Sequence, residues 1–180
     1  PDVAINRGDA PPAIRTRQSD FGLRYAFAGG LRLVAGVFTI AKPYFNLDPA
    51  LEFRQLGTTT NRGIELSLAG SIAPGLNVVA GGVLVDAGIA GAAVDSGLIG
   101  ARPVGSSRRR LIFDVDWRLN GGTSPWSFDI SINSLSARVG NSANTLMAPG
   151  REVIDLGMRY RLGLPFGNAL LRVQVINLTN

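Results

Sequence analysis

The sequence contains no cysteine and no histidine, and charged residues make up only 17% of its 180 residues. The chain therefore has no thiol nucleophile, no histidine-based triad and none of the ligand sets that zinc usually takes. Soluble domains average roughly 25% charged residues, so this chain is poor in charge. No apolar run reaches the roughly 18 residues of a membrane-spanning helix, and no segment sustains the 3.6-residue period of an amphipathic helix.

Apolar and polar side chains alternate along residues 111–133. The apolar positions are Leu111, Phe113, Val115, Trp117 and Leu119, followed by Trp126, Phe128, Ile130 and Ile132. A period of two is typical of a β-strand with one apolar and one polar face. Residues 120–125, between the two arms, are rich in turn-forming types. The pattern predicts a β-hairpin whose apolar face needs a partner.

Six further segments show the same alternation or are bounded by the same kind of turn. They cover residues 14–27, 31–42, 62–72, 76–85, 154–162 and 169–178. In the segment 31–42 both parities are apolar, and we assign Leu31, Leu33, Ala35 and Val37 to the outer face. The sequence thus predicts an all-β fold, an antiparallel up-and-down meander of about eight strands.

The predicted connections alternate between short and long. Short ones fall at 28–30, 73–75, 120–125 and 163–168, and long ones at 43–61, 86–109 and 134–151. In a meander this places all long loops at one end, as in outer-membrane barrels with short periplasmic turns and long extracellular loops. The aromatic residues Phe27, Trp117, Trp126, Tyr160 and Phe166 lie near the tight turns, where an interfacial girdle is expected.

Two other classes compete with a membrane barrel. A soluble sandwich would bury the apolar faces against a second sheet, although the asymmetry of the loops argues against it. The net charge of +5 suits nucleic acid, anionic lipid or an anionic ligand. Because the basic residues are dispersed rather than clustered with aromatic ones, nucleic acid is not an expected partner.

Several stretches are similar to a known family. They are residues 15–25 (RTRQSDFGLRY), 38–43 (FTIAKP), 61–70 (NRGIELSLAG), 74–80 (PGLNVVA), 155–160 (DLGMRY) and 171–180 (LRVQVINLTN). In this order and spacing they resemble the C-terminal barrel portion of TonB-dependent outer-membrane receptors of the siderophore-uptake kind. The family barrel has about 22 strands around a plug, so the resemblance implies a fragment: residues 1–180 as barrel, without the plug or the final strand.

The resemblance also implies a function. The expected location is the bacterial cell outer membrane, in contact with lipid and lipopolysaccharide. The expected activity is the uptake of a ferric siderophore, with coupling to TonB through a region absent here, and neither enzymatic chemistry nor a cofactor is expected. The alternative is a complete small eight-stranded barrel with a structural or adhesive role, which would require residues 14–27 to pair with residues 169–178. An outer-membrane lipase or protease is disfavoured because the chain has no histidine.

Two sets of residues are candidates for a site. Candidates for ligand binding in the long loops are Tyr44, Phe45, Arg54, Arg108 and Arg109, by aromatic stacking or by attraction of an anionic chelate or phosphate. Loop packing and a solvated strand entrance are the competing and favoured interpretations. The second set is a lumen-facing polar ladder of Glu65, Asp114, Asp116, Arg118, Asp129, Arg159 and Arg172. Cross-strand charges of this kind fix the register of strands, and neither a catalytic residue nor a metal site is expected.

Overall fold

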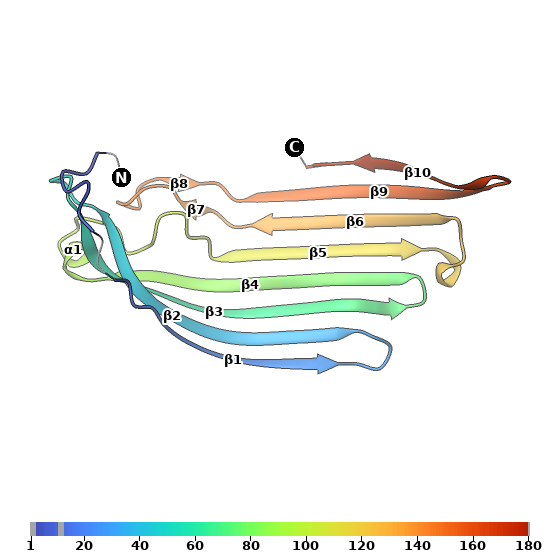
Figure 1. The fold of residues 1–180 in the computed structure, drawn as a ribbon, viewed down its shortest axis with the longest axis horizontal. Coiled ribbons are helices and arrows are strands. Elements are labelled where there is room, and N and C mark those ends of the chain that lie inside the picture. Colours follow the sequence, from blue (N-terminus) through green and yellow to red (C-terminus); the bar gives the residue numbers. More distant parts are fainter. Residues whose placement is uncertain (1–2, 11–12, 180) are drawn as a thin grey trace.

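The computed structural model describes residues 3–10 and 13–179, and its main feature is one eight-stranded antiparallel sheet (Figure 1). The strands are β1 (Arg17–Ala26), β2 (Arg32–Leu47), β3 (Phe53–Ala73), β4 (Leu76–Ala90), β5 (Arg109–Arg118), β6 (Trp126–Leu135), β9 (Arg151–Leu164) and β10 (Gly167–Val175). Their spatial order follows the chain. The predicted all-β up-and-down meander is therefore confirmed. Pro1, Asp2 and Asn180, the ends of the predicted fragment, lie outside the described residues.

The sheet is open. Strands β1 and β10 are its opposite edges, and Figure 1 shows them on opposite sides of the sheet. The pairing of residues 14–27 with residues 169–178, which a closed eight-stranded barrel would require, is therefore wrong. Within residues 3–10 and 13–179, no helix combines the length and the apolar character of a membrane span.

The register gathers the apolar side chains on one face. Val37 lies opposite Phe21 on one side and Ile64 on the other, which confirms the face assigned to β2. Across the other half of the sheet, Val115 lies opposite Ile130. These side chains are uncovered, since Phe21 is 78% exposed and the sheet is a single layer. A second sheet packed against this face, as in a soluble sandwich, is not found among the described residues.

The connections differ between the two ends of the sheet (Figure 1). Tight connections at 27–31, 74–75, 119–125 and 165–166 lie at one end, and those at 48–52, 91–108 and 136–150 lie at the other. The connection 91–108 carries the helix α1 (Ala92–Asp95), and 136–150 carries a small hairpin of β7 (Arg138–Val139) and β8 (Met147–Ala148). The tight connection 119–125 contains the 3-10 turn η1 (Asn120–Gly122).

One predicted loop is wrong. The segment 43–61 is mostly strand: β2 continues to Leu47, β3 begins at Phe53, and only residues 48–52 connect them. Pro43 lies within β2, and β3 carries an extra residue, Leu56, where the register shifts between Tyr44 and Phe45. The alternation along β3 therefore breaks although the pairing continues. The threonines at 58–60 are β-branched and extend β3.

Candidate functional site

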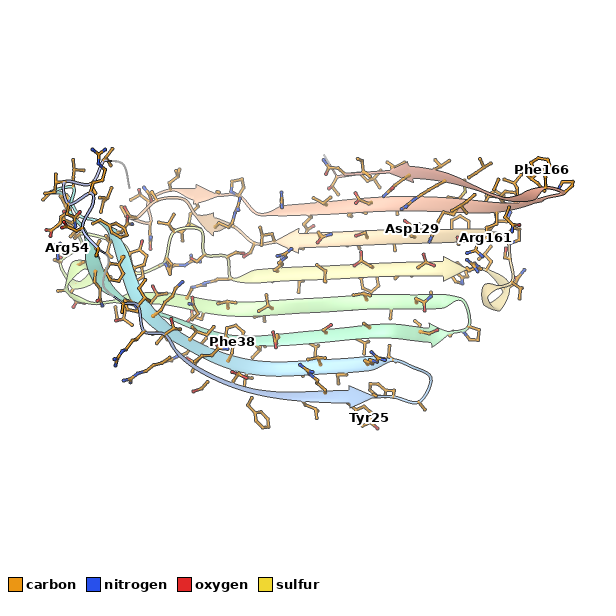
Figure 2. All side chains as sticks on the ribbon, in the orientation of Figure 1. Tyr25, Phe38, Arg54, Asp129, Arg161 and Phe166 are labelled. Carbon is orange, nitrogen blue, oxygen red and sulfur yellow. The ribbon has the colours of Figure 1, made fainter. Side chains whose placement is uncertain are left out.

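Four charged side chains meet on the polar face of the sheet, one from each of β5, β6, β9 and β10. The Nε of Arg159 lies 3.3 Å from Oδ1 of Asp129, and Nη2 of Arg172 lies 3.6 Å from Oδ2 of the same carboxylate. Arg159 also donates through Nη2 to the carboxylate of Asp116. Figure 2 shows Asp129 in the body of the sheet, away from the loops. The cluster thus ties the four strands at the C-terminal end of the chain together.

The register explains why these contacts run diagonally. Asp116 lies directly opposite Asp129, and Arg159 lies directly opposite Arg172, so each directly opposed pair carries like charges. Such pairs are destabilising unless each charge finds an opposite partner on the diagonal. Gly157 makes room for this, because a Cβ at that position would collide with the carboxylate of Asp129. The ladder therefore depends on a glycine that the charge pattern alone does not indicate.

The other three members of the predicted ladder share the polar face but remain apart. Glu65 extends over Gly36, Asp114 lies opposite Ser131, and Arg118 lies opposite Ser127. In the part of the chain that the structure describes, none of the three forms an ion pair. The predicted set is thus brought together only in part.

Loss of Asp129 is expected to weaken the cluster. In an Asp129→Asn variant Arg159 and Arg172 remain opposed, and we expect a loss of about 1–2 kcal/mol in the free energy of unfolding, because these side chains are only partly buried. Urea unfolding of the full-length barrel in detergent measures it. Adding Arg172→Gln removes the repulsion, so the double variant should lose less than the sum of the two single variants. If the losses of the two single variants simply add, Asp129 and Arg172 are not coupled. Asp114→Asn is the control, because it removes a carboxylate that forms no ion pair among the described residues.

The predicted loop candidates Tyr44 and Phe45 lie on β2, at the end of the sheet with the larger connections. Tyr44 packs against a small core formed by Leu56, Ile89 and Ile99. Its hydroxyl accepts a hydrogen bond of 3.0 Å from the side-chain amide of Asn46. Phe45 stacks on the ring of Phe53, with 6.0 Å between the ring centroids. Both aromatic residues therefore hold the β2–β3 hairpin together.

Arg54 is engaged at the tip of the same hairpin, where Figure 2 labels it. Its Nε donates to Oδ2 of Asp48 over 2.6 Å, and Oδ1 of Asp48 accepts the backbone N–H of Glu52 over 3.0 Å. The hydrogen bond from Arg54, followed by that from the Glu52 amide, lowers the pKa of the Asp48 carboxyl, and the same contact raises the pKa of Arg54. The Arg54 side chain is still 49% exposed, so part of the guanidinium faces solvent.

Arg109 is the first residue of β5, and Arg108 lies in the bend just before it. Leu84 pairs with Arg109, and the ladder continues by one residue where the amide of Val85 donates to the carbonyl of Arg108 over 2.9 Å. Leu84 lies on the apolar face, and its strand partner Arg109 lies there too. Arg108 is outside the strand and lines a hollow together with Arg62 and Asp86. The backbone amides of Arg108 and Arg109 both donate to the hydroxyl of Ser136 over 3.1 Å. The backbone therefore bends at Arg108, because successive amides of a regular strand point to opposite edges.

The connections 91–108 and 136–150 are joined by hydrogen bonds that the sequence did not suggest. The side chain of Asn144 accepts the amide of Arg102 over 2.8 Å and donates to its carbonyl over 2.9 Å. The amide of Gly100 donates to the carbonyl of Ser142 over 2.7 Å. Asn144 has a positive φ of 59°, a conformation that asparagine tolerates. No local feature of the sequence indicates this contact.

Across residues 3–10 and 13–179, no group of three or more His, Cys, Asp or Glu side chains is placed to hold a metal ion. The features of the site are a partly neutralised charge cluster on one face, an uncovered apolar face, and a braced end with larger connections.

Comparison with known proteins identifies relatives of the chain. Residues 5–178 match a protein family described as TonB dependent receptor-like, beta-barrel. The ferrichrome receptor FcuA of Yersinia enterocolitica is 28% identical over 98% of this chain and 23% of its own length.

Solved structures agree in fold. BauA, the ferric preacinetobactin receptor of Acinetobacter baumannii, superposes with a TM-score of 0.79 and 27% identity, over 100% of this chain and 27% of that one. Fiu, the ferric-catecholate import receptor of K12 E. coli, superposes with a TM-score of 0.74 and 21% identity, over 98% of this chain and 25% of that one. At this identity the similarity concerns the fold alone. The chain thus spans about a quarter of the length of these relatives.

Proposed function

Because this chain belongs to the TonB-dependent receptor-like β-barrel family, whose members are outer-membrane transport receptors rather than enzymes, we propose that it forms part of the wall and rim of a receptor for a ferric siderophore. The proposal rests on one observation: an uncovered apolar face lies opposite a charged face, and the larger connections gather at one end. In a bilayer the apolar face contacts hydrocarbon and the charged face lines a wet lumen.

The parts of the chain have separate roles in this proposal. The connections at 48–52, 91–108 and 136–150 lie on the extracellular side and help to capture the iron chelate. The cluster of Asp116, Asp129, Arg159 and Arg172 holds the register of the lumen wall. Energy for uptake comes from TonB, acting through a part of the receptor that these residues do not include. The wall performs no chemistry on the cargo.

Arg108 is the strongest candidate for contact with an anionic chelate, because it is exposed and lies next to the braced connections. Arg54, which is paired with Asp48, and the two packed aromatic residues Tyr44 and Phe45 are weaker candidates. Arg109 is also weaker, because it lies on the apolar face.

An Arg108→Ala variant of the full-length receptor should therefore bind its ferric siderophore roughly ten- to hundredfold more weakly, since a charge-assisted hydrogen bond contributes about 1.5–3 kcal/mol. Fluorescence quenching or calorimetry on purified receptor measures the affinity. Arg161→Ala is the matched control, because Arg161 is exposed near the tight turns (Figure 2). An unchanged affinity in Arg108→Ala would remove this residue from the site, and an equal loss in both variants would indicate a non-specific effect of charge.

A further inference from the structure

The connection 91–108 folds back onto the polar face of the sheet. Its residue Ile99 is buried together with Leu56 and Ile89. Ile89 lies on β4 an even number of residues from Val83, whose partner on β3 is Glu65, so it shares the polar face with that carboxylate. In the proposed function this face lines the lumen. The segment around Ile99 therefore lies on the lumen side of the extracellular mouth.

One side chain of the neighbouring connection 136–150 holds this segment. The side-chain oxygen of Asn144 accepts the amide of Arg102 over 2.8 Å, and its side-chain nitrogen donates to the carbonyl of Arg102 over 2.9 Å. The same nitrogen lies 3.3 Å from the carbonyl of Asn141 in its own turn. Asn144 thus pairs with both backbone groups of one residue in the other connection, as a neighbouring strand would.

Gly100 provides the space for this contact. A Cβ at position 100 would overlap the side chain of Asn144. The φ of Gly100 is not positive, so its backbone conformation does not require glycine, and the close approach of Asn144 is what does. The amide of Gly100 also donates to the carbonyl of Ser142 over 2.7 Å. We call the contacts of Asn144 with Gly100 and Arg102 the loop junction.

Further contacts join the two connections closer to the sheet. The amide of Gly105 donates to the carbonyl of Val139 over 2.8 Å. The hydroxyls of Ser107 and Ser136 lie 2.9 Å apart. Val139 is only 2% exposed, so this part of the pair is well packed. The two connections are therefore in contact from the strand ends up to the loop junction, and they can move as one body.

We propose that Asn144 is a positioning residue for ligand capture. Seated in the space left by Gly100, it joins the connections 91–108 and 136–150 into one preformed wall of the mouth, and the ferric siderophore meets a fixed surface instead of two loops that close on it. A preformed surface binds more tightly because it loses less conformational freedom on binding. The ligand in this proposal rests on the proposed function, whereas the loop junction itself does not.

The first test measures the loop junction without ligand. Val104 and Leu146 are exposed positions, one in each connection, and the chain has no cysteine of its own. Spin labels on cysteines placed there in the full-length receptor in liposomes should give one narrow distance distribution, which ferric siderophore does not shift. Asn144→Gly tolerates the positive φ but removes the side chain, and it should broaden the distribution. Asn144→Asp keeps the acceptor for the Arg102 amide and should broaden it less.

A second variant reaches the same contact from the other side. Gly100→Ala leaves Asn144 intact but displaces its side chain, so it should broaden the distribution as Asn144→Gly does. Gly88→Ala is the matched control, because a Cβ there meets only the carbonyl oxygen of Ala101 at 3.9 Å. Heat-modifiable migration in gels verifies that the barrel of each variant is folded.

The affinity for ferric siderophore tests the positioning role. Asn144→Gly and Gly100→Ala should each bind roughly tenfold more weakly, through the loss of two hydrogen bonds that pre-organise the wall. The double variant should bind no more weakly than either single variant, since both remove one junction. A narrow distribution in Asn144→Gly, a wild-type distribution that ligand shifts, unchanged affinity in both variants, or additive losses would each overturn the proposal. A wild-type receptor that binds no ferric siderophore would refute the proposed function, while the label distances would still decide whether the loop junction exists.

Discussion

Arginine in place of Val115 or Ile130 is expected to prevent stable assembly in the outer membrane, whereas arginine in place of Ser131 is expected to be tolerated. Val115 and Ile130 lie opposite each other in the middle of the apolar face. A charged side chain at the lipid midplane of a barrel costs about 2–4 kcal/mol. Ser131 is the neighbour of Ile130 along β6 but lies on the polar face.

Position 131 is a suitable control because an arginine there would lie between acidic side chains. Ser131 lies opposite Asp114 on β5 and Asp155 on β9, so an arginine there gains opposite charges on both sides. The measurement is the abundance of heat-modifiable, full-length receptor in outer-membrane fractions, followed by urea unfolding of the variants in liposomes. Equal tolerance of arginine at all three positions would show that the apolar face does not contact lipid.

The fold followed from the sequence wherever alternation was regular. The hairpin predicted around residues 111–133 corresponds to β5 and β6, and the face assigned to β2 agrees with its register against β1 and β3. Alternation is informative because one face meets an apolar medium and the other meets water. The same signal identified which charged residues share a face.

Pattern reasoning failed where local geometry departs from regular pairing. Pro43 obscured the continuation of β2, and the extra residue Leu56 obscured the start of β3, so both stretches of strand were interpreted as loop. The ladder contacts also depend on diagonal reach and on the space left by Gly157, neither of which is encoded in period-two alternation. Arg108 and Arg109 looked like consecutive residues of one strand entrance, yet the chain bends at Arg108 and β5 begins at Arg109. Contacts between distant segments, such as that of Asn144 with Arg102, have no local signature at all.

The tight-turn end offers a second test with a large expected effect. Gly75 connects β3 to β4 with a positive φ of 78°, and a Cβ there would collide with the backbone of Arg118 and Gly122. The Gly75 carbonyl accepts the amide of Arg118 over 2.7 Å, so the two turns are already held together and cannot readily separate. Substitution here therefore combines backbone strain with overpacking.

A Gly75→Ala variant should lose about 2–5 kcal/mol in its free energy of unfolding. This is the sum of about 1–2 kcal/mol for an alanine in the left-handed conformation and about 1–3 kcal/mol for overpacking. Gly121 separates the two contributions, because it has a similar φ of 64° but only Pro74 Cβ at 3.6 Å near its own added Cβ. Gly121→Ala should therefore lose only the contribution of the left-handed conformation, about 1–2 kcal/mol. Urea unfolding of both variants in the full-length barrel makes the comparison. Since backbone atoms cannot rotate away as a side chain can, equal losses would mean that the two turns are not packed against each other.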